Sequence, residues 1–151
     1  MDRLKDKVCI VTGGAQSLGR AMAERFAGEG AKMVVVFDIQ DTTFEQANIR
    51  FVKGSVTDRD ACYALAKAVW DEFGRIDVLV NNAGVIRDAM THKMTDDQWY
   101  ECLDINLKGA LYMTGAVGPY MMEQGTGSLI GLGSLAGMSV NFLLCRGVLF
   151  K

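Results

Sequence analysis

The residues of this sequence that could do chemistry begin with a glycine-rich stretch, Thr12-Gly-Gly-Ala-Gln-Ser-Leu-Gly19. An apolar run, Val8–Val11, precedes it, and an amphipathic segment that begins at Leu18 follows it. A buried strand, a glycine turn and a helix N-terminus together form an anion site, because backbone N–H groups and the positive end of the helix dipole point at the ligand. The stretch therefore predicts a phosphate-binding turn. The alternative is an ordinary strand-to-helix turn.

The spacing of the glycines narrows the kind of phosphate site. It differs from the Gly-x-Gly-x-x-Gly fingerprint, and the stretch does not end in Gly-Lys-Ser/Thr. A P-loop for nucleoside triphosphates is therefore not indicated.

Other polar residues stand directly after short apolar runs. Asp38, Asn81-Asn-Ala-Gly84 and Gly133-Ser134 each follow such a run. In parallel sheets ligands bind outside the carboxyl ends of the strands, so these residues should border one crevice. A carboxylate at Asp38 can accept hydrogen bonds from both ribose hydroxyls of an adenosine and would repel a 2′-phosphate, which favours NAD over NADP. A solvated turn residue is the alternative for Asp38.

The apolar runs themselves predict the strands of one sheet. The predicted strands span 8–11, 33–37, 49–52, 76–80 and 128–132. Helical patterns separate them, except between the second and third strands, where residues 42–48 form a polar loop. Alternation of strands and helices with right-handed crossovers gives a parallel, doubly wound sheet. We therefore predict a Rossmann-like α/β fold.

Three helices are predicted to cover this sheet. The first ends at Gly28 with Gly30 as its C′ residue, and the second spans 58–73. The third begins at the capping box Thr95-Asp-Asp-Gln98 and extends to about Glu123, a length that leaves room for an interruption. The predicted sheet-facing residues are Leu18, Met22 and Phe26 in the first helix and Ala61, Leu65, Ala68, Val69 and Phe73 in the second.

The composition argues against several other classes of protein. Half of the 151 residues are apolar and one is proline, which is typical of a globular chain. A net charge of −2 without a basic cluster favours neither nucleic acid nor a membrane surface as partner. No apolar run has the length of a signal or membrane-spanning segment. Four widely spaced cysteines without Cys-x-x-Cys indicate free thiols rather than a zinc site. We expect a cytoplasmic protein without a metal.

With these motifs in place, the sequence resembles the classical branch of the short-chain dehydrogenase/reductase family. The matching segments, which occur in the family's order from about residue 5 to about residue 140, are 12–19, Asp38, 81–84, 106–109 and 127–137. Segments 86–88 and 94–99 are most similar to 3-oxoacyl-ACP reductases and related alcohol dehydrogenases. The resemblance implies hydride transfer between a nicotinamide cofactor and a small carbonyl or alcohol compound.

The resemblance also implies roles for single residues. Asn106 matches the asparagine that positions a proton-relay water, and Ser134 matches the serine that hydrogen-bonds the substrate oxygen. Ser17 replaces the middle glycine of the turn, and Ser55 replaces an aspartate that binds the adenine amino group. The implied cofactor-binding residues are Gly13, Gln16, Ser17, Leu18, Gly19, Asp38, Ser55, Val56, Asn81, Ala83 and Gly84.

One catalytic residue of the family has no counterpart. The family's acid/base tyrosine lies thirteen residues after the serine, where this sequence has Gly147. Lys151 stands at the position of the family's lysine, which lowers the pKa of that tyrosine, but its neighbours differ from the family and we interpret the match as chance. Residues 1–140 are predicted to form the dinucleotide-binding domain and residues 141–151 an atypical tail, such as a frameshift would give.

Without the family's later strands, the Rossmann-like sheet is expected to be incomplete at its C-terminal side. The fifth strand then forms an exposed apolar edge, so we expect a homo-oligomer or self-association.

Two functions remain open at this point. The chain is an NAD-linked oxidoreductase, or it is a module that binds the dinucleotide or a partner without turnover, which the missing tyrosine favours. His92 matches no family motif and is interpreted as a solvated side chain. Tyr100, Tyr112 and Tyr120 lie on the predicted third helix and are interpreted as packing residues.

Overall fold

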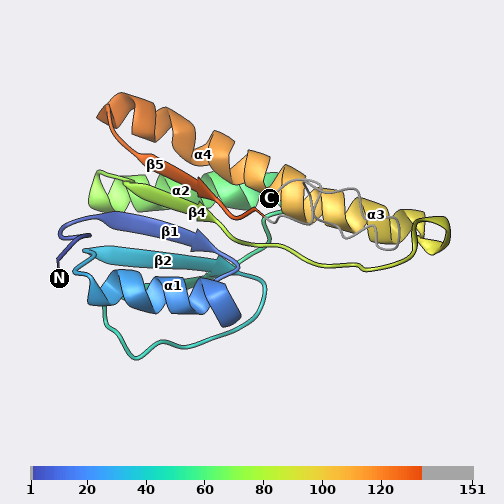
Figure 1. Ribbon diagram of the computed structural model, residues 1–151. Helices are drawn as coiled ribbons and strands as arrows, with labels where there is room; N and C mark the ends of the chain where they lie inside the picture. The colour runs from blue at the N-terminus through green and yellow to red at the C-terminus, as the bar shows by residue number, and fades with distance from the viewer. Residues whose placement is uncertain (1, 134–151) are drawn as a thin grey trace.

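A computed structural model of the chain describes residues 2–133, which form a five-stranded parallel sheet (Figure 1). The strands are β1 (Val8–Thr12), β2 (Met33–Asp38), β3 (Ile49–Lys53), β4 (Val78–Asn81) and β5 (Ser128–Gly131). Their order in the sheet is β3-β2-β1-β4-β5, and every neighbouring pair is parallel. The predicted Rossmann-like α/β fold is confirmed.

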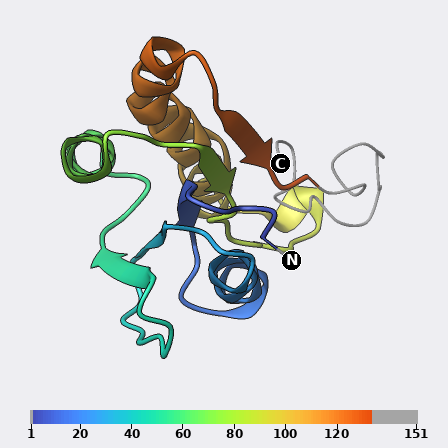
Figure 2. The ribbon, with the colours of Figure 1, turned by 90° about the vertical axis from the view of Figure 1, so that its left-hand side faces the viewer.

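Helices cover both faces of this sheet (Figure 2). Helix α1 (Ser17–Gly28) lies on one face, and α2 (Arg59–Phe73) and α4 (Gly109–Gln124) lie on the other. Successive strand residues point to opposite faces, so Val8 and Ile10 of β1 pack under α2 and α4, while Cys9 and Val11 pack under α1. This is why β1 and β2 are apolar without alternation.

The helix faces differ in part from the predicted ones. In α1 the buried residues are Gly19, Ala23 and Ala27, with Met22 and Phe26 packed beside them, whereas Leu18 is 58% exposed. Small residues let α1 approach the sheet closely, and Leu18 is turned away from it. In α2 the prediction was wrong for Ala68, which is exposed. The face of α2 toward the core is formed by Cys62, Leu65, Ala66 and Val69.

The connection from β2 to β3, residues 39–48, contains no helix, as predicted. Phe44 from this connection packs with Ile49 and Phe51 against the α1 side of the sheet. A single aromatic side chain therefore covers part of the face that a crossover helix would cover.

The predicted third helix is present and contains the interruption that its length left room for. A separate 3-10 turn, η1 (Thr91–Lys93), precedes it. The helix begins with α3 (Asp96–Cys102), continues through a π-helical turn, η2 (Leu103–Lys108), and ends in α4. The predicted capping box is present, with the Gln98 N–H donating to Thr95 Oγ1 at 3.3 Å and the Thr95 N–H donating to Gln98 Oε1 at 3.0 Å. A π turn within an α-helix often marks a functional site.

Strand β5 is the least buried part of the sheet. All four of its residues are exposed, including Leu129 and Ile130, and within residues 2–133 it pairs with β4 alone. Self-association through this strand stays a prediction.

A buried carboxylate, Asp77, joins the beginnings of the central strands. It accepts hydrogen bonds from the Val8 N–H at 2.9 Å, from Lys7 Nζ at 3.2 Å and from Arg75 Nε at 2.7 Å. Its backbone also bonds to Val8 and Ser128, the first residues of β1 and β5. Burial by itself would raise the pKa of Asp77, but the hydrogen bonds from Arg75, Val8 and Lys7 outweigh it and hold that pKa below its ordinary value.

We expect Asp77→Asn to lower the free energy of unfolding at pH 7 by about 1–3 kcal/mol, because charge-assisted hydrogen bonds to a buried group are lost. Since the folded pKa is depressed, the wild-type carboxylate stabilises the fold above the unfolded pKa of about 3.9 and loses this effect as pH falls through the lower folded value. The variant should therefore lose less stability than wild type below about pH 4. Urea unfolding at several pH values measures both effects.

Asp71→Asn is the matched control, because Asp71 forms an exposed ion pair with Lys67 on the same helix face. Such pairs contribute at most about 1 kcal/mol. An Asp77→Asn variant as stable as this control at pH 7 would contradict the assigned role.

Candidate functional site

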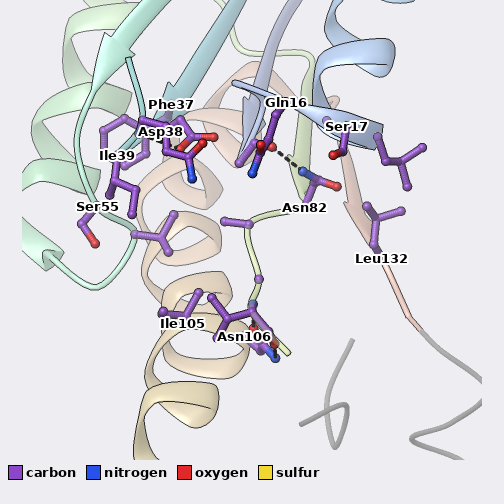
Figure 3. A pocket seen from close by; sticks show the side chains of 18 of the residues that line it. Gln16, Ser17, Phe37, Asp38, Ile39, Ser55, Asn82, Ile105, Asn106 and Leu132 are labelled. Atoms are coloured by element: carbon purple, nitrogen blue, oxygen red, sulfur yellow. Dashed lines mark hydrogen bonds between the residues drawn. The ribbon is translucent and has the colours of Figure 1, made fainter. Parts of the chain in front are cut away.

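The site is built where β1 and β4 end, and a network of hydrogen bonds ties these two ends together. Thr12 Oγ1 donates to the Val80 carbonyl and accepts from the N–H groups of Asn82 and Ala83, at 3.0–3.3 Å. Asn82 Nδ2 donates to the carbonyls of Thr12 at 2.9 Å and Gly13 at 2.8 Å. The Thr12 hydroxyl and the Asn82 amide thus hold the glycine turn against the end of β4. Figure 3 shows Asn82 beside the turn that carries Gln16 and Ser17.

This close approach leaves no room for side chains at two of the glycines. Gly13 has φ +64°, and a Cβ there would lie 2.7 Å from Ala83 Cα. A Cβ on Gly19 would lie 2.2 Å from the Gly13 carbonyl oxygen and 2.4 Å from Asn82 Nδ2. Ser17 also has a left-handed backbone, with φ +49°, although it carries a side chain. The turn therefore holds strain at Ser17.

Helix α1 begins at this turn. Its N-cap residue, Gln16, makes no side-chain hydrogen bond to the helix, and the first turn contains no acidic residue. Asp38 Oδ2 accepts from the Ala15 N–H at 2.9 Å, just before the helix. A twelve-residue helix that begins without a side-chain cap or an acidic side chain presents its first N–H groups and its dipole to an anion.

A cavity of about 800 Å³ lies over the carboxyl ends of the strands. It is bordered by the glycine turn, by the residues after β2 and β3, and by the segment after β4 (Figure 3). The predicted cofactor-binding residues that line it are Gly13, Gln16, Ser17, Leu18, Gly19, Asp38, Ser55, Val56, Ala83 and Gly84. The structure thus brings together positions from four separate segments of the sequence.

Asn81 is the predicted cofactor-binding residue that lies outside this cavity. Its Nδ2 donates to Thr114 Oγ1 of α4 at 3.0 Å, and it lines a smaller pocket of about 200 Å³ that also borders Asn106. The neighbouring amide, Asn82, turns toward the glycine turn instead. Along an extended chain adjacent side chains point to opposite sides, which separates the two asparagines.

Asp38 is part of the turn after β2, and its predicted role toward a ribose stays a prediction. Oδ2 accepts from the Ala15 N–H and Oδ1 from the Gln40 N–H at 3.0 Å, so the carboxylate fixes the backbone on both sides of it. Each ionised oxygen has a second lone pair for a further donor. Asp38 is therefore a turn-fixing residue whose charge borders the cavity.

Asn106 lies in the π turn η2, is 7% exposed and lines the cavity. Its Oδ1 accepts from the Val85 N–H at 2.8 Å and its Nδ2 donates to the Val85 carbonyl at 3.0 Å. The side chain thus clamps the segment after β4 to the long helix. The sequence indicated Asn106 as a site residue but gave no sign of this backbone clamp.

Several cavity-lining residues were missed from the sequence. Phe37 and Leu132 are the last residues of predicted strands, and Ile39 and Gly54 lie two residues beyond one, so the strand ends themselves were a usable signal. Gln40, Val85, Ile86 and Asp88 lie farther from a strand end, and Ile105 in the π turn carried no signal. The missed residues are Phe37, Ile39, Gln40, Gly54, Val85, Ile86, Asp88, Ile105 and Leu132, whereas Asn82 and Gly133 belong to segments that were expected to border the crevice.

The other titratable candidates lie away from the cavity. His92 is exposed in η1. Tyr120 stacks on Trp70 with ring centroids 5.0 Å apart, and Tyr112 packs against the same core, as expected. The interpretation of Tyr100 as a packing residue was wrong, because it is 60% exposed. Ser134, Gly147 and Lys151 lie outside the described residues, as does the tail 141–151.

Reactive thiols and metal clusters are not found in residues 2–133. Cys9, Cys62 and Cys102 are free and buried, and burial raises the pKa of Cys9 to about 12 and that of Cys62 to about 11. Within the same residues no group of three or more His, Cys, Asp or Glu side chains could hold a metal ion. Nor does this part of the chain contain a helix that is long and apolar enough to cross a membrane.

Comparison with known proteins agrees with the site. A family model described as short chain dehydrogenase matches residues 7–145. The chain belongs to the short-chain dehydrogenase family, which confirms the resemblance.

Its relatives include a 3-oxoacyl-[acyl-carrier-protein] reductase, FabG, of Thermotoga maritima, 38% identical over 92% of this chain and 60% of the relative. An acetoacetyl-CoA reductase of Paracoccus denitrificans is 40% identical over 87% of this chain and 56% of the relative. Among solved structures, the aldohexose dehydrogenase of Thermoplasma acidophilum has a TM-score of 0.83 and 34% identity, covering 93% of this chain and 53% of that one. The chain thus spans about three fifths or less of the length of these proteins.

We expect Ser17→Gly to raise the free energy of unfolding by up to about 1 kcal/mol, because glycine relieves the left-handed backbone strain. The gain is limited because glycine also increases the entropy of the unfolded chain. Gly13→Ala is the contrasting variant. It should destabilise by at least about 1 kcal/mol, since its Cβ would collide with Ala83. The free energies of unfolding of the two variants, measured with denaturant, should change in opposite directions from that of the wild type. A Ser17→Gly variant less stable than the wild type would contradict the assignment of strain.

Proposed function

We propose that this chain binds NAD in the cavity over its strand ends, as an oxidoreductase of its family acting on a small carbonyl or hydroxyl compound. The observation that carries the proposal is that the N-terminus of α1 and the Asp38 carboxylate border the same cavity. The uncapped N-terminus of α1 suits a pyrophosphate, and the Asp38 carboxylate suits the hydroxyls of an adenosine ribose. Both line one cavity large enough for an extended ligand.

The residues present fit a dinucleotide along the whole cavity. Gly13 and Gly19 let the pyrophosphate approach the backbone, Asp38 holds the adenosine ribose, and Ser55 and Val56 border the adenine end. Ala83 and Gly84 then border the nicotinamide half. When bound, the nicotinamide accepts or gives the hydride. The proposal includes the roles that the family implies for two further residues. Ser134 hydrogen-bonds the substrate oxygen, and Asn106 positions a water.

Charge supports NAD over NADP as the cofactor. The described cavity lining contains two carboxylates, Asp38 and Asp88, and no lysine, arginine or histidine. A 2′-phosphate would meet a carboxylate with no cation in this lining to offset the repulsion. The proposed substrate class, a small carbonyl or hydroxyl compound, is what the relatives have in common. Their names include reductases of acyl thioesters and a sugar dehydrogenase, and these pair a carbonyl with an alcohol.

Asp38→Asn should change the preference between the two dinucleotides. The amide keeps the shape of the side chain but removes its charge, so affinity for NADP relative to NAD should rise about tenfold. The ratio of the two dissociation constants from calorimetry is the measurement, because loss of the bond to Ala15 weakens both complexes alike. Asp41→Asn, on the same connection but outside the cavity, is the control. Equal affinity of the wild-type chain for both dinucleotides would contradict NAD selectivity.

The second candidate, binding without turnover, rests on Gly147. A ketone that accepts a hydride becomes an alkoxide that must be protonated, and a positioned acid contributes about 10² to 10⁴ in rate. Glycine has no proton to give, and the hydroxyl of Ser134 is a poor acid. We therefore expect the purified chain to reduce ketones at least about 10²-fold more slowly than a relative with the tyrosine. The decrease of NADH absorbance with a panel of ketones measures this. Equal turnover would refute the second candidate.

A further inference from the structure

Arg20 contacts the β2–β3 connection with both terminal nitrogens of its guanidinium. Nη1 donates to Thr42 Oγ1 at 2.8 Å and Nη2 donates to the Thr43 carbonyl at 3.0 Å. The guanidinium carbon lies 4.6 Å from the centroid of the Phe44 ring. On the helix itself, Nε donates to Glu24 at 2.8 Å. Three consecutive residues of the connection are therefore held by one side chain.

The segment that Arg20 contacts, residues 42–44, follows closely after residues that line the cavity. The connection contains no helix or strand between β2 and β3, and its first residues, Ile39 and Gln40, line the cavity after Asp38. Arg20 lies in the first turn of α1, where its backbone N–H makes the ordinary helical bond to the carbonyl of the N-cap residue Gln16. Arg20 itself is not among the cavity-lining residues. Its side chain therefore joins the first turn of α1, which follows the glycine turn, to residues 42–44 of the connection.

We propose that Arg20 is a positioning residue for the adenosine half of the cofactor. By holding residues 42–44 against α1, it fixes the wall formed by Asp38, Ile39 and Gln40 opposite the glycine turn. This inference rests on the proposed binding of NAD. Lysine cannot replace Arg20, because the contact uses two divergent N–H directions and a planar group stacked on an aromatic ring. Without the contact, the wall must be ordered when the ligand binds, and affinity falls.

The connection offers a matched control. Lys53 pairs with Asp41 at 2.6 Å, and both side chains are more than half exposed. This pair holds the same segment one residue before the Arg20 contact, but an exposed ion pair of this kind has little effect. Lys53→Met therefore removes a bond to the connection without removing the proposed positioning.

The test compares Arg20→Met, Arg20→Lys and Lys53→Met with the wild type. Amide hydrogen exchange without ligand should accelerate in residues 39–48 of both Arg20 variants, while β1 and β4 keep their protection. Calorimetry should show affinity for NAD and for ADP lowered about tenfold in both, and changed less than about twofold in Lys53→Met. A purely structural role would instead accelerate exchange throughout the chain.

Two results would overturn the inference. Exchange in residues 39–48 that matches the wild type would show that Arg20 does not hold the connection. Faster exchange with unchanged affinity for ADP would show that the connection does not position the adenosine half. A wild-type chain that binds neither NAD nor ADP would refute the proposed function, and the positioning role with it. In that case the exchange data would show only whether Arg20 holds residues 42–44.

Discussion

The site depends on the close approach of two backbone segments, the glycine turn after β1 and the segment after β4. Pairing of Val11 with Val80 brings both strand ends to the same level. Beyond that point the carbonyls of Thr12 and Gly13 and the N–H groups of Asn82 and Ala83 leave the sheet pattern, and they need other partners. The Thr12 hydroxyl and the Asn82 amide supply these partners. Because the turn is satisfied internally, the first N–H groups of α1 are left for a ligand.

The other walls of the cavity use the same device, in which one polar side chain bonds to the backbone of a distant segment. Asp38 joins β2 to the residue before α1, and Asn106 joins the long helix to Val85. Each of these bonds connects segments more than twenty residues apart in the sequence. The cavity is thus shaped by side chains that serve the backbone, and a ligand meets walls that are already in place. Such preorganisation lowers the entropy lost on binding.

The strands could be predicted because strands buried on both faces of a parallel sheet are continuous apolar runs, and β1 and β2 are of this kind. The glycine turn, Asp38 and the capping box at Thr95 have equally local signals. Helix faces were harder to predict. Leu18 fits the apolar period of α1, yet it lies beside the cavity, because the small residues Gly19 and Ala23 form the contact with the sheet. The residue types alone do not show which of Asn81 and Asn82 points to the glycine turn. That depends on where β4 ends, because adjacent side chains of an extended chain point to opposite sides.

The π turn η2 has a consequence for how the long helix tolerates changes of length. A residue added to or removed from a helix rotates everything beyond it by about 100°. In the present phase, Met113, Val117 and Met121 of α4 reach the core, while Asn106 faces Val85 from the turn before it. Losing one residue from η2 would move either the core residues or the asparagine out of place. The length of the helix through η2 is therefore fixed from both sides, by the core under α4 and by the bond to Val85.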